Sequence, residues 1–86
     1  MGNRDRNEII ASILQSIINA KEKEGIRTTR IMYNSFLSFS MVMHYLKLLT
    51  ENGSLEYYRP NKTYRITDKG LRFLELQNEI DEMLKA

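Results

Sequence analysis

The stretch TTRIMYNSFLSFSMVMHYLKLLTENG, residues 28–53, decides the fold of this 86-residue chain. A threonine at its start can cap a short helix that ends near Ser35, and Ser38 can cap a longer helix that reaches Asn52. Gly53 then ends the longer helix, because glycine readily adopts the left-handed conformation of a helix C-terminus. Two helices joined by a turn this short are typical of a helix-turn-helix unit.

The longer helix, residues 38–52, has an apolar side and a polar side on a helical wheel. The apolar side is expected to be buried and holds Phe39, Val42, Tyr45, Leu46 and Leu49. The opposite side, called here the outer face, holds Ser40, His44, Lys47 and Glu51. Between the two sides lie the flanking residues Met41, Met43 and Leu48. The sequence therefore predicts a polar surface bordered by apolar side chains.

An apolar helix is predicted before this unit. Asp5 and Glu8 have the spacing of a capping box, in which each side chain accepts a hydrogen bond from the other's backbone amide. Residues at helical spacing are expected to enter the core, namely Ile9, Ile10, Ile13, Leu14, Ile17 and Ile18. We expect this helix to continue until Gly25 stops it. Further core positions are expected at Ile31, Met32 and Leu37.

After Gly53 the periodicity changes from that of a helix to that of a strand. Residues 55–59 and 63–67 are rich in aromatic and β-branched side chains and predict two strands. A short segment with a proline, residues 60–62, predicts the turn between them. The hairpin is expected to direct Leu55 and Ile66 inward. Its tyrosines, Tyr57, Tyr58 and Tyr64, are expected to pack across the strands rather than stack on single-stranded bases.

A last helix is predicted over about residues 69–85, capped by Thr67 or Asp68. The order is then helix, helix, helix, strand, strand, helix. This is a mainly helical α+β fold, and it is the order of a winged helix-turn-helix (α-α-α-β-β) followed by a C-terminal helix. We expect residues 1–70 to form the winged-helix domain and residues 71–86 to form a separate dimerisation helix.

Length and composition indicate one small globular domain, with 42% hydrophobic and 28% charged residues and no cysteine. No apolar run is long enough to span a membrane. The charged start at residues 1–6 is not followed by an apolar segment, so we expect no signal peptide and a cytoplasmic location.

Nothing in the sequence indicates an enzyme. His44 is the only histidine, and it lacks the cysteines or clustered carboxylates that a zinc site needs. It also has no nucleophile partner at a recognisable spacing, and no glycine-rich phosphate-binding loop is present. We therefore expect no catalytic residue, no metal, no cofactor and no small-molecule ligand.

Charge is distributed unevenly along the chain. Residues 27–65 carry six basic and two acidic side chains, a net charge of +4. Residues 70–86 carry two basic and four acidic side chains, a net charge of −2. This division predicts that the middle of the chain meets a polyanion and that the C-terminal segment does something else.

Three motifs carry a family resemblance: TRIMY at residues 29–33, YRITDKG at residues 64–70 and FL at residues 73–74. With these motifs the chain resembles the small archaeal winged-helix DNA-binding proteins, including the ten-kilodalton chromatin-associated type. The resemblance implies double-stranded DNA binding by a homodimer whose C-terminal helices form an antiparallel coiled coil. It also implies a role as a transcriptional regulator or a nucleoid-associated architectural protein.

The predicted DNA contacts come from three places. The longer helix would enter the major groove with Ser38, Ser40, Met41, His44 and Lys47. The start of the short helix would offer donors to phosphate from Thr28, Thr29 and Arg30. The hairpin would follow the backbone or the minor groove with Arg59, Asn61, Lys62 and Arg65. Alternatively, one threonine is only a helix cap, and the charged side chains only keep these surfaces soluble.

The last helix carries a two-heptad apolar seam. Its members are Phe73, Leu76, Ile80 and Met83, which are flanked by glutamates and are expected to join two copies of the chain. Leu71 and Leu74 are expected to close the core of the domain instead. The alternative is that the whole helix packs on its own domain.

Two functions are compatible with this pattern. The first is a homodimeric double-stranded DNA-binding protein with no membrane or small-molecule partner. The alternative is a winged-helix protein-protein interaction module, with Met41, Met43 and Leu48 as its contact surface.

Overall fold

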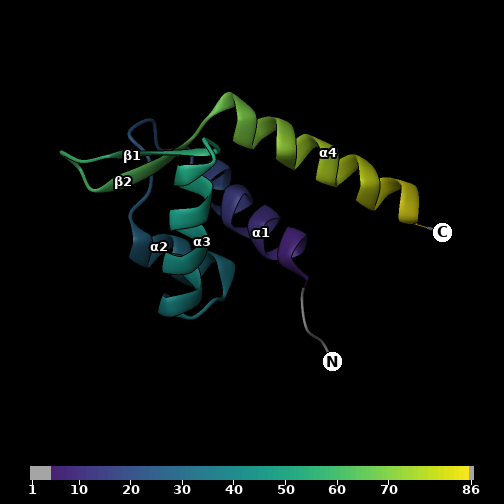
Figure 1. The fold of residues 1–86 in the computed structure, drawn as a ribbon, viewed down its shortest axis with the longest axis horizontal. Helices are drawn as coiled ribbons and strands as arrows, with labels where there is room; N and C mark the ends of the chain where they lie inside the picture. Colours follow the sequence, from purple (N-terminus) through teal and green to yellow (C-terminus); the bar gives the residue numbers. More distant parts are fainter. Residues whose placement is uncertain (1–4, 86) are drawn as a thin grey trace.

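The computed structural model describes residues 5–85 (Figure 1). It contains three helices, an antiparallel hairpin and a final helix, in the predicted order. The winged-helix, mainly helical α+β fold class is therefore confirmed. The first four residues of the charged start, where no signal peptide is expected, lie outside the described part of the chain.

The first helix, α1 (Arg6–Asn19), begins with the predicted capping box. The Glu8 N–H donates to Asp5 Oδ1 at 2.8 Å, and the Asp5 N–H donates to Glu8 Oε1 at 3.0 Å. The predicted end of this helix at Gly25 is wrong. The helix stops at Asn19, because Lys21 already adopts the left-handed conformation with φ 56°.

The second helix, α2 (Thr28–Ser35), places Ile31 fully in the core. The expectation that Thr28 or Thr29 caps it is wrong. Its N-cap is Arg27, whose side chain makes no capping hydrogen bond. At the other end Phe36 adopts the left-handed conformation, φ 58° and ψ 39°, which turns the chain toward the third helix.

The third helix, α3 (Phe39–Glu51), is capped as predicted, because Ser38 Oγ accepts a hydrogen bond from the Met41 N–H at 3.3 Å. Asn52 is its C-cap, and the following residue, Gly53, has φ 87°. Its buried side consists of Val42, Leu46 and Leu49. In Figure 1, α3 lies beside α2 and leads directly into the hairpin.

The hairpin consists of β1 (Leu55–Tyr58) and β2 (Thr63–Ile66). Leu55 pairs with Ile66 and Tyr57 pairs with Tyr64. Leu55 is buried and Ile66 packs against the core, as the sequence predicts.

An additional one-residue bridge joins the loop before α2 to the hairpin. The Ile26 N–H donates to the Tyr64 carbonyl at 2.9 Å, and the Tyr64 N–H donates to the Ile26 carbonyl at 2.8 Å. Gly25 makes this close approach possible, because a Cβ there would lie 2.6 Å from the Tyr64 carbonyl oxygen, and its φ of 94° favours glycine. This bridge was not predicted from the sequence.

The last helix, α4 (Asp68–Leu84), begins after Thr67, whose hydroxyl accepts a hydrogen bond from the Gly70 N–H at 3.2 Å. Leu74 is buried against the domain as predicted, but Leu71 is 41% exposed, so its expected core position is wrong. α4 packs on α1, and Leu74 rather than Leu71 enters the core.

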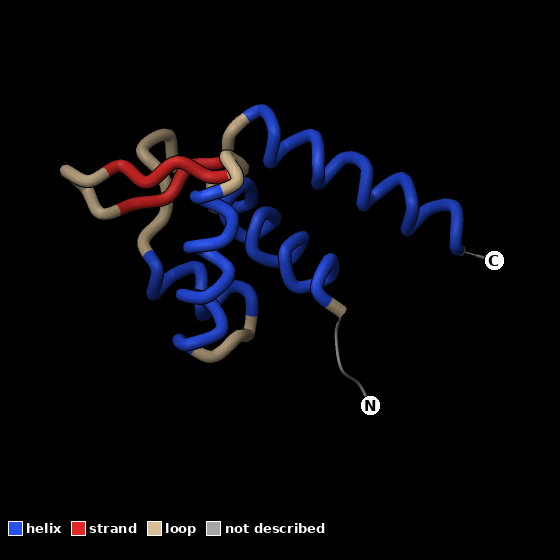
Figure 2. Tube along the Cα trace, in the orientation of Figure 1, coloured by secondary structure: helices blue, strands red, loops and turns tan. Residues whose placement is uncertain are grey.

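The core lies between α1, α3 and the base of the hairpin, with α4 closing one side. Its buried apolar members are Ile9, Ile10, Ile13, Leu14, Ile17, Ile26, Ile31, Val42, Leu46, Leu49, Leu55 and Leu74. The molecule measures 45 × 28 × 22 Å, and the hairpin tip and the C-terminal end of α4 lie at opposite ends of its long axis (Figure 2).

Candidate nucleic-acid interface

The outer face of α3 is accessible over its whole length. Ser40, His44, Lys47 and Glu51 are all exposed, as the helical wheel predicts. The buried side of the same helix is anchored by Leu46, which is fully buried. Because the helix is fixed from behind and capped at its start, it presents these polar side chains from a rigid support.

The flanks of this face are more apolar than the sequence predicts. Met41 and Met43 are 37% and 38% exposed, and Leu48 is half-buried. Phe39, which the wheel assigns to the core, is 58% exposed, and that expectation is wrong. Phe39 stands in the first turn of α3. The wheel gives the direction of a side chain but not how far the neighbouring helices extend beside it.

The start of α2 lies near the hairpin. Thr28 is half-buried and hydrogen-bonds through its side chain to Tyr64, whereas Thr29 is exposed. Arg30 forms an ion pair with Glu22, with Nη1 and Oε2 3.2 Å apart and each side chain about half exposed. Such an exposed pair contributes at most about 1 kcal/mol, so the guanidinium remains available to an anion. Arg27, which was not predicted as a contact, is also exposed here.

The hairpin turn divides its predicted contact residues into two groups. Arg59 and Lys62 are exposed and form no salt bridge with any residue between 5 and 85. Asn61 donates from Nδ2 to Glu24 Oε1 at 2.8 Å, which ties the turn to the loop after α1. Arg65 is half-buried and lies over the Tyr58 ring, 4.4 Å from its centroid. The first two side chains are therefore accessible, whereas the last two also hold the hairpin in place.

The first strand of the hairpin packs against α3. Tyr57 and Tyr64 pack with their ring centroids 4.9 Å apart, which confirms the predicted cross-strand packing. Burial raises the pKa of the Tyr64 phenol above 10.0, nearby Tyr57 raises it further, and the hydrogen bond with Thr28 lowers it. Between hairpin and helix lies a hollow of about 320 Å³, lined by Met43, Lys47, Thr50, Glu51, Tyr57 and Tyr64.

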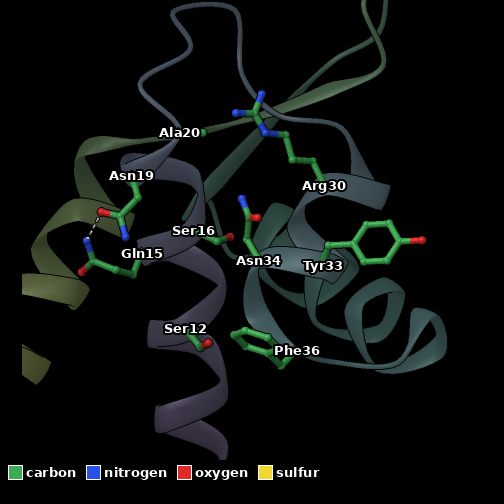
Figure 3. Close-up of a pocket in the computed structure, with 9 residues that line it drawn as sticks. All are labelled: Ser12, Gln15, Ser16, Asn19, Ala20, Arg30, Tyr33, Asn34 and Phe36. Atoms are coloured by element: carbon green, nitrogen blue, oxygen red, sulfur yellow. Dashed lines mark hydrogen bonds between the residues drawn. The ribbon is translucent and has the colours of Figure 1, made fainter.

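A different groove, of about 530 Å³, lies between α1 and α2 (Figure 3). Phe36 points toward Ser12 across this groove, and the Tyr33 ring points away from it. Gln15 donates to Asn19 there at 2.8 Å, so these two amides are already paired with each other. Among the predicted contact residues only Arg30 reaches this groove, which therefore lies apart from the surface of α3.

The predicted seam of α4 is only partly free. Leu76 and Ile80 are 43% and 49% exposed, and Met83 is 81% exposed. Phe73 instead is half-buried and packs against the core. The start of α4 is thus docked on the domain, while the remainder carries an apolar stripe that the rest of residues 5–85 covers only in part.

The described part of the chain holds neither a metal-binding cluster nor a membrane-spanning helix. Between residues 5 and 85, no three histidine, cysteine, aspartate or glutamate side chains are grouped closely enough to hold a metal ion. No helix in this range combines the length and apolar character needed to cross a membrane.

Comparison with known proteins agrees with this arrangement. No curated protein matches the sequence significantly. A family described as winged helix-turn-helix matches residues 3–85, which is nearly the whole chain. The matched region includes the helix-turn-helix of α2 and α3, the β1–β2 hairpin that forms the wing, and α4. The chain belongs to the winged helix-turn-helix family.

Proposed function

We propose that this protein binds double-stranded DNA as a homodimer, with α3 in the major groove and the hairpin as its wing. The observation that carries the proposal is the accessible outer face of α3 beside a hairpin whose Arg59 and Lys62 form no salt bridge within residues 5–85. A recognition helix needs base-facing side chains, and the wing needs cations for phosphate. Both requirements are met on adjacent elements of a family fold suited to DNA.

The predicted contact residues on α3 and α2 have different roles in this proposal. On α3, Ser40 and His44 face the bases and Lys47 reaches a base or a phosphate, while the hydroxyl of Ser38 serves mainly as the helix cap. At α2, the exposed Thr29 and Arg30 meet the phosphate backbone. The remaining predicted contacts are Thr28, Met41, Arg59, Asn61, Lys62 and Arg65.

The apolar stripe of α4 supports the dimer. Two copies that pair through Leu76, Ile80 and Met83 would each keep an α3 free for one duplex, and the target would be palindromic if the spacing fits. The domain of residues 1–70 would then bind DNA, and residues 71–86 would pair with the same residues of a second copy. Such a dimer serves as a transcriptional regulator or as a nucleoid-associated architectural protein in the cytoplasm.

Fluorescence anisotropy with a mixed-sequence duplex tests DNA binding. The affinity should fall by roughly a hundredfold or more between about 50 and 200 mM salt, because several phosphates release their counterions. Lys47→Ala and Lys62→Ala should each lower the slope of log affinity against log salt by about 1. Lys85→Ala is the matched control at the far end of α4. Absence of binding at the lower salt would contradict the proposal.

The exposed methionines favour one second candidate, a protein-binding module. The double substitution Met41→Lys, Met43→Lys separates the two functions. If the surface meets DNA, the added positive charge should leave the phosphate-driven affinity unchanged or raise it. If the surface binds a protein, the same change should abolish capture of that partner.

A further inference from the structure

The first two turns of α3 present apolar side chains where a recognition helix usually presents hydrogen-bonding ones. Phe39, Met41 and Met43 are 58%, 37% and 38% exposed. Between residues 39 and 46 there is no lysine, arginine, asparagine, glutamine, aspartate or glutamate. Ser40 and His44 are the exposed polar side chains of this segment.

This composition restricts which bases the helix can read. In the major groove, arginine and lysine read guanine, asparagine and glutamine read adenine, and acidic side chains read cytosine. The one feature there that an apolar side chain recognises is a methyl group at C5 of a pyrimidine, which in ordinary DNA belongs to thymine. The N-terminal residues of a recognition helix are those that meet the base edges.

The apolar side chains border both sides of the outer face. Phe39 and Met43 stand one turn apart on the side of the hairpin, where Met43 lines the hollow shared with Tyr57 and Tyr64. Met41 lies on the opposite flank. Phenyl and thioether groups on both sides can therefore contact methyl groups that project from the floor of the groove, and methionine adapts to their position.

We infer that α3 recognises thymine through its 5-methyl group, using Phe39, Met41 and Met43. This inference rests on the proposed DNA binding and gives it a sequence preference. No hydrogen-bonding side chain in this segment provides a bidentate contact, so base selection depends on methyl contacts supplemented by Ser40 and His44. The phosphate contacts of Lys47, Arg59 and Lys62 supply affinity without selecting a base.

Pairs of duplexes that differ only in the methyl group test the inference. The first pair is alternating poly(dA-dT) and poly(dA-dU), and the second is poly(dG-dC) and its 5-methylcytosine form. The full-length protein should bind the methylated member of each pair at least about fourfold more tightly, since one buried methyl group is worth about 0.8 kcal/mol. Both members should show the same salt slope, because their phosphates are identical.

Substitutions test whether Phe39, Met41 and Met43 cause the preference for the methylated duplexes. The triple substitution Phe39→Ala, Met41→Ala, Met43→Ala should reduce the affinity ratio of each pair to about 1. Phe36→Ala is the matched control, because Phe36 is also an exposed phenylalanine, at 91%, but faces the groove between α1 and α2. The control should keep the full ratio. Circular dichroism of each variant checks that it remains folded.

Three results would overturn the inference. Equal binding of the methylated and unmethylated duplexes, with a steep salt slope, refutes thymine recognition and leaves phosphate-driven DNA binding intact. A methyl preference that survives in the triple variant refutes the role of these side chains, because it then arises from the stiffness of the duplex. Absence of binding to all four duplexes at low salt refutes both the inference and the proposed function.

Discussion

Gly70 lets α4 pass close to Ser54 in the loop before the hairpin. A Cβ at this position would overlap the Ser54 carbonyl oxygen and lie 2.9 Å from Ile66 Cγ1. Alanine usually stabilises a helix by about 1 kcal/mol relative to glycine, but this overlap reverses the sign. We predict that Gly70→Ala lowers the free energy of unfolding by about 2 kcal/mol in urea titrations. Asn7→Ala, at an exposed helical position, is the control and should not be destabilising.

Tyr64 makes the free energy of unfolding depend on pH in the alkaline range. Its pKa is raised in the folded state, chiefly by burial, so the folded protein holds the phenolic proton more tightly than the unfolded chain. This contribution to stability is complete below pH about 10, the unfolded pKa, and is lost as the pH rises through the higher folded pKa. Tyr64→Phe should remove it, which urea titrations between pH 8 and 11.5 can measure. An unchanged pH profile in this variant would contradict the prediction.

At the scale of elements, local signals predicted most of the fold. Helix caps at Asp5 and Ser38 lie where the sequence places them, and Thr67 is the cap of α4 among its two candidates, because a cap depends on side chains within three residues. The Ile26 bridge was missed, since a pairing of one residue has no periodicity. The exposure of Phe39 was missed for a similar reason, because it depends on how far other helices reach.

For the candidate site, the exposed face of α3 was predicted from the sequence, but the tertiary partners of its side chains were not. The outer face of α3 follows from helical spacing alone, and it is exposed as expected. The tertiary partners of Arg30, Asn61 and Arg65 are Glu22, Glu24 and Tyr58. The first two pairings join distant segments, and spacing along the chain carries no signal for either.

Two serines at the start of α3 have separable roles. Ser38 caps the helix, so Ser38→Ala should lower the free energy of unfolding by about 1 kcal/mol. Ser40 is exposed, so Ser40→Ala should change stability by less than about 0.5 kcal/mol and affect only DNA affinity. Thermal unfolding and anisotropy of the two variants together check this division. Equal destabilisation by both would contradict it.

At the scale of the whole molecule, the placement of α4 decides the proposed assembly. Leu76 and Ile80 are about half exposed in one copy, so replacing them should leave its fold intact while removing the apolar stripe. We predict that Leu76→Asp, Ile80→Asp converts a dimer into a monomer by sedimentation equilibrium. Tyr33→Asp is the control, because Tyr33 is 70% exposed but lies on α2. A wild-type protein that is monomeric at micromolar concentration would refute the dimer.

The bridge between Ile26 and Tyr64 also makes amide hydrogen exchange differ between the base and the tip of the hairpin. Its two amide hydrogens are locked between the loop before α2 and the hairpin, so they can exchange with deuterated solvent only when these distant segments separate. Amides at the hairpin tip, such as that of Asn61, lie in a turn and exchange through local opening. Exchange at the base of the wing therefore reports the separation of these two segments, while the tip, held to the loop after α1 by the Asn61 side chain, reports only its own local opening.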